Sequence, residues 1–168
     1  KIVDWQEQSS YDALTGLYNR CFLFESGKRE LAKAKRWEKI GVKYPISMIL
    51  IDVDRFKRFN DEEGHAAGDE VFRRIAALLK TVCRREVDTI YRLGERSDEF
   101  VVLLPQTDKK GALVVVKKIQ TATEKLFSPG GRAIGLSYGV AEAESFFLEE
   151  LLKKADEEMY KTKKGLKA

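Results

Sequence analysis

The sequence predicts an α+β fold, a ferredoxin-like sheet with helices packed on it, and three observations support this prediction. Apolar runs of strand length alternate with longer segments whose apolar residues recur at helical spacing. Two of the runs, 89–93 and 100–104, are separated by a short polar stretch and therefore form a hairpin. The chain has 168 residues and no internal repeat, so we expect one domain with a sizeable core.

Each predicted element has its own signal. The first strand is an apolar run, as expected of a buried strand, and the helices carry one apolar face. Asp108 supplies an N-cap, whereas Gly41 with Pro45 ends the first helix. The predicted elements, in chain order, are a helix over 21–39, a strand over 46–53, a helix over 66–82, strands over 89–93 and 100–104, a helix from 108 to near Pro129, a strand over 134–141 and a helix over 147–163.

Composition excludes several classes of protein. Charged residues of both signs are plentiful, so the net charge of +4 is spread over a solvated surface and argues against nucleic acid as a partner. Cys21 and Cys83 lie in no metal-binding spacing, and two reduced thiols fit a cytoplasmic location. No apolar stretch approaches the length of a membrane span, and no signal peptide precedes the domain.

Two pairs of carboxylates stand at the ends of apolar runs. Asp52 and Asp54 lie at the carboxyl end of the first predicted strand, where α/β sheets usually place their chemistry. Asp98 and Glu99 open the second run of the hairpin, which brings them next to the first pair. Because Mg²⁺ prefers oxygen ligands, two acidic strand ends that face one gap predict a magnesium site.

These motifs resemble those of the GGDEF family of diguanylate cyclases, which join two GTP molecules into cyclic di-GMP and release pyrophosphate. Nearly the whole chain takes part in the resemblance, which implies the fold of nucleotidyl cyclase and polymerase palm domains. The matching segments, in the family's order, are Asp-Ala-Leu-Thr-Gly-Leu-Tyr-Asn-Arg over 12–20, the acidic strand end and Gly-His-x-x-Gly-Asp turn over 51–69, the signature over 92–100, Ser-Tyr-Gly-Val-Ala over 137–141, and 155–163.

The family signature, Arg-x-Gly-Gly-Asp-Glu-Phe, is altered here. The run from Arg92 to Phe100 contains two extra residues, and Ser97 replaces a glycine. Glycine suits such a turn because it reaches positive φ without strain and lets a phosphate approach the backbone. A longer loop still cradles phosphates if its amides converge, and Arg96 offers a compensating charge. We therefore expect the alteration to affect the rate of reaction more than nucleotide binding.

The resemblance implies a two-metal reaction that joins a ribose 3′-hydroxyl to an α-phosphate. By position in the motifs, Asp52 and the backbone carbonyl of Val53 are metal ligands, and Asp98 is the ligand and catalytic residue that the signature supplies. Glu99 stands beside it as a second catalytic residue, and Asp54 is the weaker ligand candidate. The alternative without a function is that acidic residues at strand ends simply face water.

Asn60 and Asp69 match the family positions that hydrogen-bond guanine. A carboxylate there accepts from the base N1–H and the exocyclic amine, a pairing that adenine does not offer, so the resemblance implies GTP as substrate. Their structural alternatives are a turn residue and a helix cap. His65, the only histidine, is interpreted as a structural member of its turn, since metal activation leaves no need for it in acid–base catalysis.

Basic residues complete the expected substrate site. Lys163 and Lys167 match the positions that neutralise the phosphates, and Lys163 is thereby also a catalytic candidate. Lys167 replaces the usual arginine, so a point charge replaces a bidentate fork. Lys57, at the turn after the first strand, reaches phosphate as well. Without the family, the lysines over 161–164 are a solvated helix end favoured by the macrodipole.

A product-inhibition site is implied by Arg85 and Asp88. This Arg-x-x-Asp pattern stands ahead of Arg92 at the family's spacing for cyclic di-GMP binding. Arginine stacks on guanine and grips phosphate bidentately, which explains the residue type. The alternative is a solvated helix end, because a four-residue pattern arises often by chance in a charge-rich chain.

The leading hypothesis is a diguanylate cyclase domain that uses Mg²⁺. Each 3′-hydroxyl must meet the other nucleotide's α-phosphate in line, so we expect a two-fold homodimer when the domain is active. The alternative is a catalytically degenerate domain that acts as a receptor for cyclic di-GMP or GTP, as the altered signature suggests. A palm that acts on nucleic acid is disfavoured because the positive charge is scattered.

The resemblance also implies a domain division. We interpret 1–10 as the end of an upstream linker helix and 11–168 as the GGDEF domain. In the family, such domains are usually linked to a sensory or receiver domain. We therefore expect such a domain upstream, together with a membrane anchor in some full-length members.

Overall fold

The computed structural model describes residues 10–94 and 98–167, the last three by their backbone alone. Its elements are α2 (Arg20–Lys39), β1 (Ile46–Val53), α3 (Phe56–Glu63), α4 (His65–Val82), β2 (Thr89–Arg92), β3 (Glu99–Pro105), α5 (Lys109–Thr123), β4 (Leu136–Glu142) and α6 (Leu148–Lys167). The expected linker helix over 1–10 lies outside the described residues except for Ser10, and so do the signature residues Glu95, Arg96 and Ser97.

Most predicted elements are confirmed to within one or two residues, and β1 has the predicted bounds. The third predicted helix ends earlier, because after α5 the chain forms a bridge between Phe127 and Ala133 and packs Leu126 and Ile134 into the core. Asp108 caps α5 as predicted, and its side chain accepts a hydrogen bond from the amide of Gly111 at 2.8 Å. Among the described helices, none combines the length and apolarity of a membrane span.

The short helix α3 was not predicted from the sequence. It has eight residues, and Phe59 is the one buried side chain among them, so its sequence carries no apolar pattern of helical spacing. Its N-cap residue, Arg55, has a left-handed backbone with φ of 54°, which turns the chain sharply out of β1. A left-handed conformation is uncommon for a non-glycine residue and is frequent at functional turns.

The four strands form one antiparallel sheet in the order β2-β3-β1-β4. This order and the helical crossovers confirm the predicted ferredoxin-like α+β fold. β1 lies in the interior of the sheet, paired with β3 on one side and β4 on the other, and all its residues are buried. An interior strand covered on both faces needs apolar side chains in both directions, which explains why all its residues but Ser47 and Asp52 are apolar.

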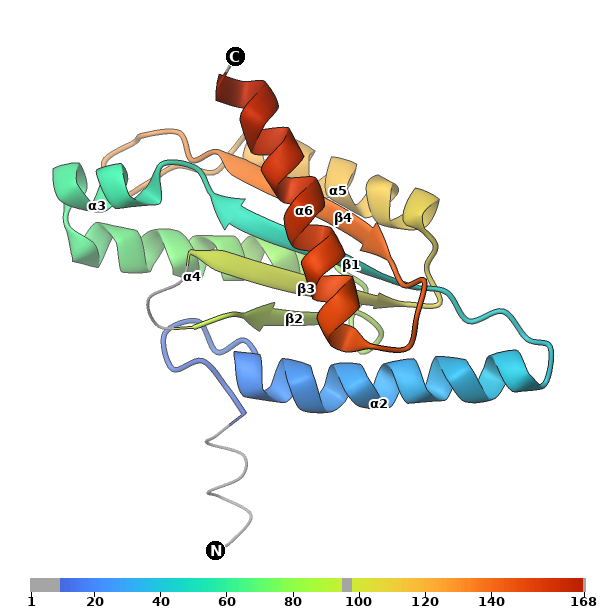
Figure 1. Ribbon diagram of the computed structural model, residues 1–168. Coiled ribbons are helices and arrows are strands. Elements are labelled where there is room, and N and C mark those ends of the chain that lie inside the picture. The colour runs from blue at the N-terminus through green and yellow to red at the C-terminus, as the bar shows by residue number, and fades with distance from the viewer. Residues whose placement is uncertain (1–9, 95–97, 168) are drawn as a thin grey trace, which may run out of the picture.

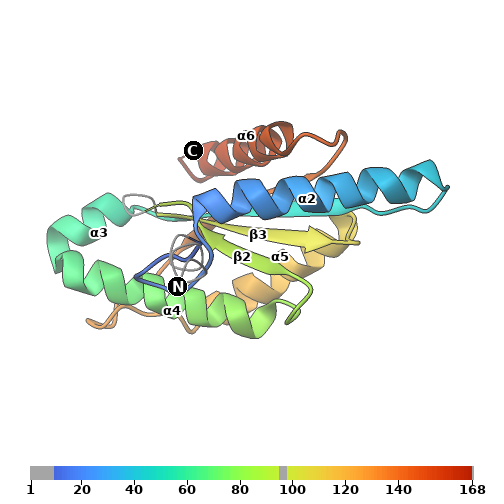
Figure 2. The ribbon, with the colours of Figure 1, turned by 90° about the horizontal axis from the view of Figure 1, so that it is seen from below.

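Helices cover the two faces of the sheet (Figures 1 and 2). α4 and α5 pack on one face, where Ile49 and Ile51 of β1 meet Ile75 and Ile119, whereas α2 and α6 lie on the other face. Alternate residues of β1 point to opposite faces, so Asp52 shares the α6 face with Leu50. The acidic end of β1 therefore points toward the last helix.

A buried ion pair fixes the segment before α2 to the end of β2. Asp12 accepts hydrogen bonds from the amide and hydroxyl of Thr15 at 3.0 and 2.6 Å, and its other oxygen accepts from Arg92 at 2.8 Å. The guanidinium of Arg92 also lies 4.5 Å from the ring centroid of Phe72. Because the altered signature follows Arg92 directly, this contact holds one end of that loop.

Candidate active site

The two acidic strand ends meet, as the sequence predicted. Asp52 pairs in register with Glu99 on the neighbouring strand β3. One residue further on, the amide of Val53 donates a hydrogen bond to the carbonyl of Asp98 at 3.2 Å. Asp52 and Glu99 lie directly opposite each other in an antiparallel pair, so their side chains share one face of the sheet.

Lys163 joins this group from α6. Its ammonium forms an ion pair with Asp52, and the Asp52 side chain retains 7% exposure. α6 crosses the face of β1 and β4, which brings a residue more than a hundred positions away in sequence to the carboxylate. A buried carboxylate requires such a charged partner.

The pKa of the Asp98 carboxyl is raised above its ordinary value because the group is partly buried, and a hydrogen bond from its own backbone opposes part of the shift. Burial raises a carboxyl pKa because it disfavours the charged form. A cation placed next to Asp98 would have the opposite effect. A metal bound at this site would therefore favour the ionised form of Asp98 beside Asp52.

Asp54 has a structural role. Its carboxylate accepts a hydrogen bond from the hydroxyl of Ser137 at 2.5 Å, and its amide donates to the carbonyl of Gly135 at 2.9 Å. A Cβ on Gly135 would lie 2.7 Å from the Asp54 carboxylate. These contacts attach the end of β1 to the start of β4.

The candidate guanine site lies between α3 and α4. The side-chain oxygen Oδ1 of Asn60 is buried and has no hydrogen-bond partner within the described part of the chain. It packs on α4 at Gly68, where a Cβ would come within 2.1 Å of it. Asp69 follows Gly68 and is exposed. A buried acceptor without a partner costs free energy, so a ligand donor at this point would satisfy it.

The simpler structural roles considered for these two residues are wrong. Asn60 lies inside α3 and is not a turn residue, while Asp69 lies inside α4, whose N-cap is Gly64. His65 begins α4 and is exposed, and Lys57 is exposed in the first turn of α3.

A cavity of about 610 Å³ opens beside the end of β1. Three cationic side chains line it: Arg55, Arg132 and Lys163. Arg132 was not found from the sequence, since a single arginine after a Pro-Gly-Gly turn carries no recognisable pattern. In the structure it donates a hydrogen bond to Glu62 on α3 at 2.5 Å, so it braces the helix that carries Asn60.

The oxygen donors at the end of β1 suit Mg²⁺. Among the described residues, no group of three or more His, Cys, Asp or Glu side chains is placed to hold a metal. Mg²⁺ needs no such cage, because it keeps several waters and binds through one or two carboxylates and the substrate phosphates. The ammonium of Lys163 already occupies a cation position against Asp52.

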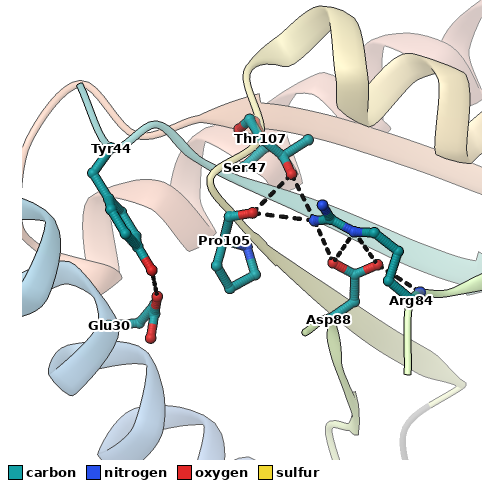
Figure 3. Close-up of polar contacts among 7 residues, drawn as sticks. All are labelled: Glu30, Tyr44, Ser47, Arg84, Asp88, Pro105 and Thr107. Atoms are coloured by element: carbon teal, nitrogen blue, oxygen red, sulfur yellow. Dashed lines mark hydrogen bonds and ion pairs between the residues drawn. The ribbon is translucent and has the colours of Figure 1, made fainter. Parts of the chain in front are cut away.

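The candidate product-site residues lie just before the start of β2, at the end of that strand away from the altered signature. Arg85 is exposed, whereas the side chain of Asp88 has 0% exposure and forms an ion pair with Arg84 at 2.7 Å (Figure 3). The sequence placed Arg85 and Asp88 together but gave no role to Arg84. Lys167 belongs to α6, but its side chain lies outside the described residues.

Comparison with known proteins points to one family. The family model described as "Diguanylate cyclase, GGDEF domain" matches residues 9–167. The chain is 33% identical over 159 residues to diguanylate cyclase DgcM of Escherichia coli strain K12, a match that covers 94% of this chain and 37% of DgcM. The chain therefore spans little more than a third of that relative.

Two solved structures share the fold. One is the GGDEF domain of YfiN (TpbB) from Pseudomonas aeruginosa, with a TM-score of 0.81 and 33% identity over 92% of this chain and 89% of that one. The other is the GGDEF domain of DgcB from Caulobacter crescentus in complex with c-di-GMP, with a TM-score of 0.79 and 26% identity over 94% of this chain and 91% of that one.

Proposed function

The chain belongs to the GGDEF domain family, and from this premise we propose that it is a diguanylate cyclase that condenses two GTP molecules into cyclic di-GMP and releases pyrophosphate. The observation that carries the proposal is the meeting of Asp52, Glu99 and Lys163 at one end of the interior strands β1 and β3, with the backbone of Asp98 hydrogen-bonded to that of Val53. Acid and base side chains gathered from three separate elements are the arrangement that phosphate chemistry requires.

GTP binds with its base between α3 and α4 in this proposal. The unpartnered Oδ1 of Asn60 accepts from guanine, and the exposed carboxylate of Asp69 accepts from the N1–H and exocyclic amine. Lys57 and the amides of the first turn of α3 bind the phosphates, joined by Lys163 and Lys167 from α6. Adenine lacks these donors, so GTP is preferred over ATP.

Asp52, the carbonyl of Val53 and Asp98 would hold Mg²⁺. When bound, Mg²⁺ supplies neutralisation of the charge on the phosphates. Lys163 then leaves Asp52 and pairs with phosphate. The same ammonium therefore neutralises Asp52 without ligand and a phosphate when GTP is bound. Glu99, on the same face as Asp52, accepts the proton of the 3′-hydroxyl as the new oxygen–phosphorus bond forms and the bond to pyrophosphate breaks.

One protomer makes half of the reaction site. The 3′-hydroxyl of each nucleotide has to attack the α-phosphate of the other, so we propose a two-fold homodimer in which two GTP molecules face each other. Cyclic di-GMP is proposed to return to Arg85 and Asp88 as an inhibitor. Residues 11–168 form the catalytic module of a longer cytoplasmic protein with an input domain upstream, as the partial coverage of DgcM supports.

The experiment is to incubate the concentrated protein with GTP and Mg²⁺ and to quantify cyclic di-GMP by chromatography. We expect product to form at a rate that rises with protein concentration, because the dimer is the active unit. GTP should bind more tightly than ATP in competition calorimetry. Asp52→Ala and Asp98→Ala should remove the metal-dependent part of GTP binding, and binding that is unchanged in both variants would contradict the proposed metal site.

A receptor that has lost turnover is the second candidate, and the altered signature favours it. The run over 94–98 is two residues longer than the family pattern and has lost a glycine. A displacement of about 1 Å at Asp98 can cost about a hundredfold in rate while binding survives. Deletion of Glu95 and Arg96 combined with Ser97→Gly should then raise turnover. GTP binding without product in the natural chain, and product in this variant, would favour the receptor.

A further inference from the structure

Arg84 holds Asp88 in a closed arrangement (Figure 3). The Arg84 side chain donates to both carboxylate oxygens, from Nε at 3.1 and 3.2 Å and from Nη2 at 2.7 Å, and its amide donates at 2.8 Å. An ionised carboxylate offers about four lone-pair positions. The Nε–H is shared between the two oxygens, so three N–H groups of Arg84 make four contacts that use this capacity, and the Asp88 side chain has 0% exposure.

The same guanidinium is anchored to the sheet. Its Nη2, which contacts Asp88, also lies 3.1 Å from the carbonyl oxygen of Pro105 and 2.9 Å from the hydroxyl of Thr107, so its two N–H groups are shared among three acceptors. Thr107 is itself held, because its carbonyl accepts from the hydroxyl of Ser47 at 2.8 Å (Figure 3). Arg84 is therefore fixed at both ends, to Asp88 and to the end of β3.

A cavity of about 640 Å³ lies beside this pair. Its lining includes three cations, Lys80, Arg84 and Arg85, together with Tyr18 and the carboxylates Glu86 and Asp88. Arg85 is exposed and makes no ion pair or hydrogen bond within the described part of the chain. A phosphate therefore finds Arg85 available, whereas the donors of a guanine base find Asp88 already occupied.

We propose that Arg84 is a latch that sets the affinity of this cavity for a cyclic guanine dinucleotide, because the ligand must displace the Arg84 guanidinium from Asp88 before its base can bind there. The inference rests on the product site proposed above and assigns a role to a residue outside the Arg-x-x-Asp pattern. Without the latch, Asp88 keeps one hydrogen bond, from the Arg84 amide, and its other positions become open to ligand.

Direct competition gives the sign of the effect. Guanine N1–H and its exocyclic amine would exchange with charge-assisted bonds from Arg84, and such bonds are stronger than those of neutral donors. In the natural chain the ligand therefore loses part of its binding free energy in opening the latch. Arg84→Ala removes that cost and should bind cyclic di-GMP about three- to tenfold more tightly, the worth of one net hydrogen bond.

The test is calorimetry of cyclic di-GMP binding to the whole chain and its variants. Arg84→Ala should bind more tightly, and adding Asp88→Asn should remove the gain. Arg85→Ala should weaken binding by about tenfold or more through loss of a charge-assisted contact. Arg29→Ala is the matched control, because it removes the same charge and an ion pair to a carboxylate four residues away, Glu25, and should leave the affinity unchanged.

Two results separate the latch from the product site. If Arg85→Ala weakens binding while Arg84→Ala is unchanged or weaker, the product site stands and the latch is wrong. If Arg85→Ala and Asp88→Asn bind like the natural chain, the product site itself is wrong and the latch falls with it. Should Arg84→Ala not fold, Thr107→Val removes one anchor of the guanidinium and should tighten binding by about twofold; weaker or equal binding there overturns the latch.

Discussion

Two buried aspartates, Asp12 and Asp52, each face a cation but serve different purposes. Asp12 receives two hydrogen bonds from Thr15 in addition to the ion pair with Arg92, and it joins the N-terminal segment to the sheet. Asp52 is paired with Lys163, whose side chain is 37% exposed and lines the cavity beside β1. The cation of Asp12 is enclosed, whereas that of Asp52 can be exchanged for another.

The difference shows how to separate a structural carboxylate from a functional one. Burial alone does not distinguish them, since their relative exposures are 7% and 5%. The distinguishing features are the number of local donors and the accessibility of the partner. A carboxylate saturated by its own neighbourhood contributes to stability, and one whose charged partner lines a cavity remains available for chemistry.

The largest expected effect on the structural side is that of Asp12→Ala. It leaves the Arg92 guanidinium buried without its charge partner, and breaking a buried pair on one side costs about 3–5 kcal/mol. Chemical denaturation should show this loss in the free energy of unfolding. Asp156→Ala, which removes an exposed aspartate of α6, is the control and should change it little. Equal losses in the two variants would contradict the assignment of Asp12.

On the functional side, Asp52→Asn should leave folding nearly unchanged and reduce turnover by more than about a hundredfold. Removing a group that merely supports a metal ligand typically costs about 10- to 100-fold, so loss of the ligand itself should cost more. Rates of cyclic di-GMP formation and melting temperatures, measured together, check this. A variant that is active but strongly destabilised would place Asp52 with Asp12 among the structural residues.

A smaller effect is expected at the contact between Gly68 and Asn60. In Gly68→Ala the new Cβ would lie 2.1 Å from the Asn60 side-chain oxygen, so Asn60 must move. Loss of its hydrogen bond to guanine should weaken GTP binding by about three- to tenfold. Asn60→Ala should weaken binding similarly, and the double variant should be no weaker than either one. Additive losses would show that the two residues act separately.

The smallest effect concerns the thiols. Burial, and to a lesser extent Asp88, raises the pKa of Cys83 to about 12, whereas Cys21 is exposed. An unfolded thiol loses its proton near pH 8.5, so the contribution of Cys83 to folding stability should fall as pH rises from there toward 12. Alkylation at pH 8 followed by mass spectrometry should modify Cys21 first. Equal rates would contradict the enclosed position of Cys83.

Much of the fold could be predicted from the sequence, because local patterns determine it. The apolar run of β1 and the one-sided apolar patterns of α4 and α5 reflect burial that neighbouring residues impose on each other. α3 escaped prediction because its eight residues bury a single side chain and its start depends on the backbone of Arg55. Arg132 contacts this helix from a distant part of the chain: it donates a hydrogen bond to Glu62, and its guanidinium lies 5.8 Å from the ring centroid of Phe59.

The sequence by itself determined which residue types stand at the strand ends, since acidic residues at the end or the start of an apolar run lie where a buried strand ends or begins. Asp52, Asp98 and Glu99 were therefore candidates from the sequence alone. Only the tertiary structure decided which cation each carboxylate receives. Arg84 and Arg85 are neighbours of equal chemistry, and the one that takes Asp88 is selected by Pro105 and Thr107, 21 and 23 residues away from Arg84. Long-range contacts of that kind leave no local pattern, because they depend on where the chain returns.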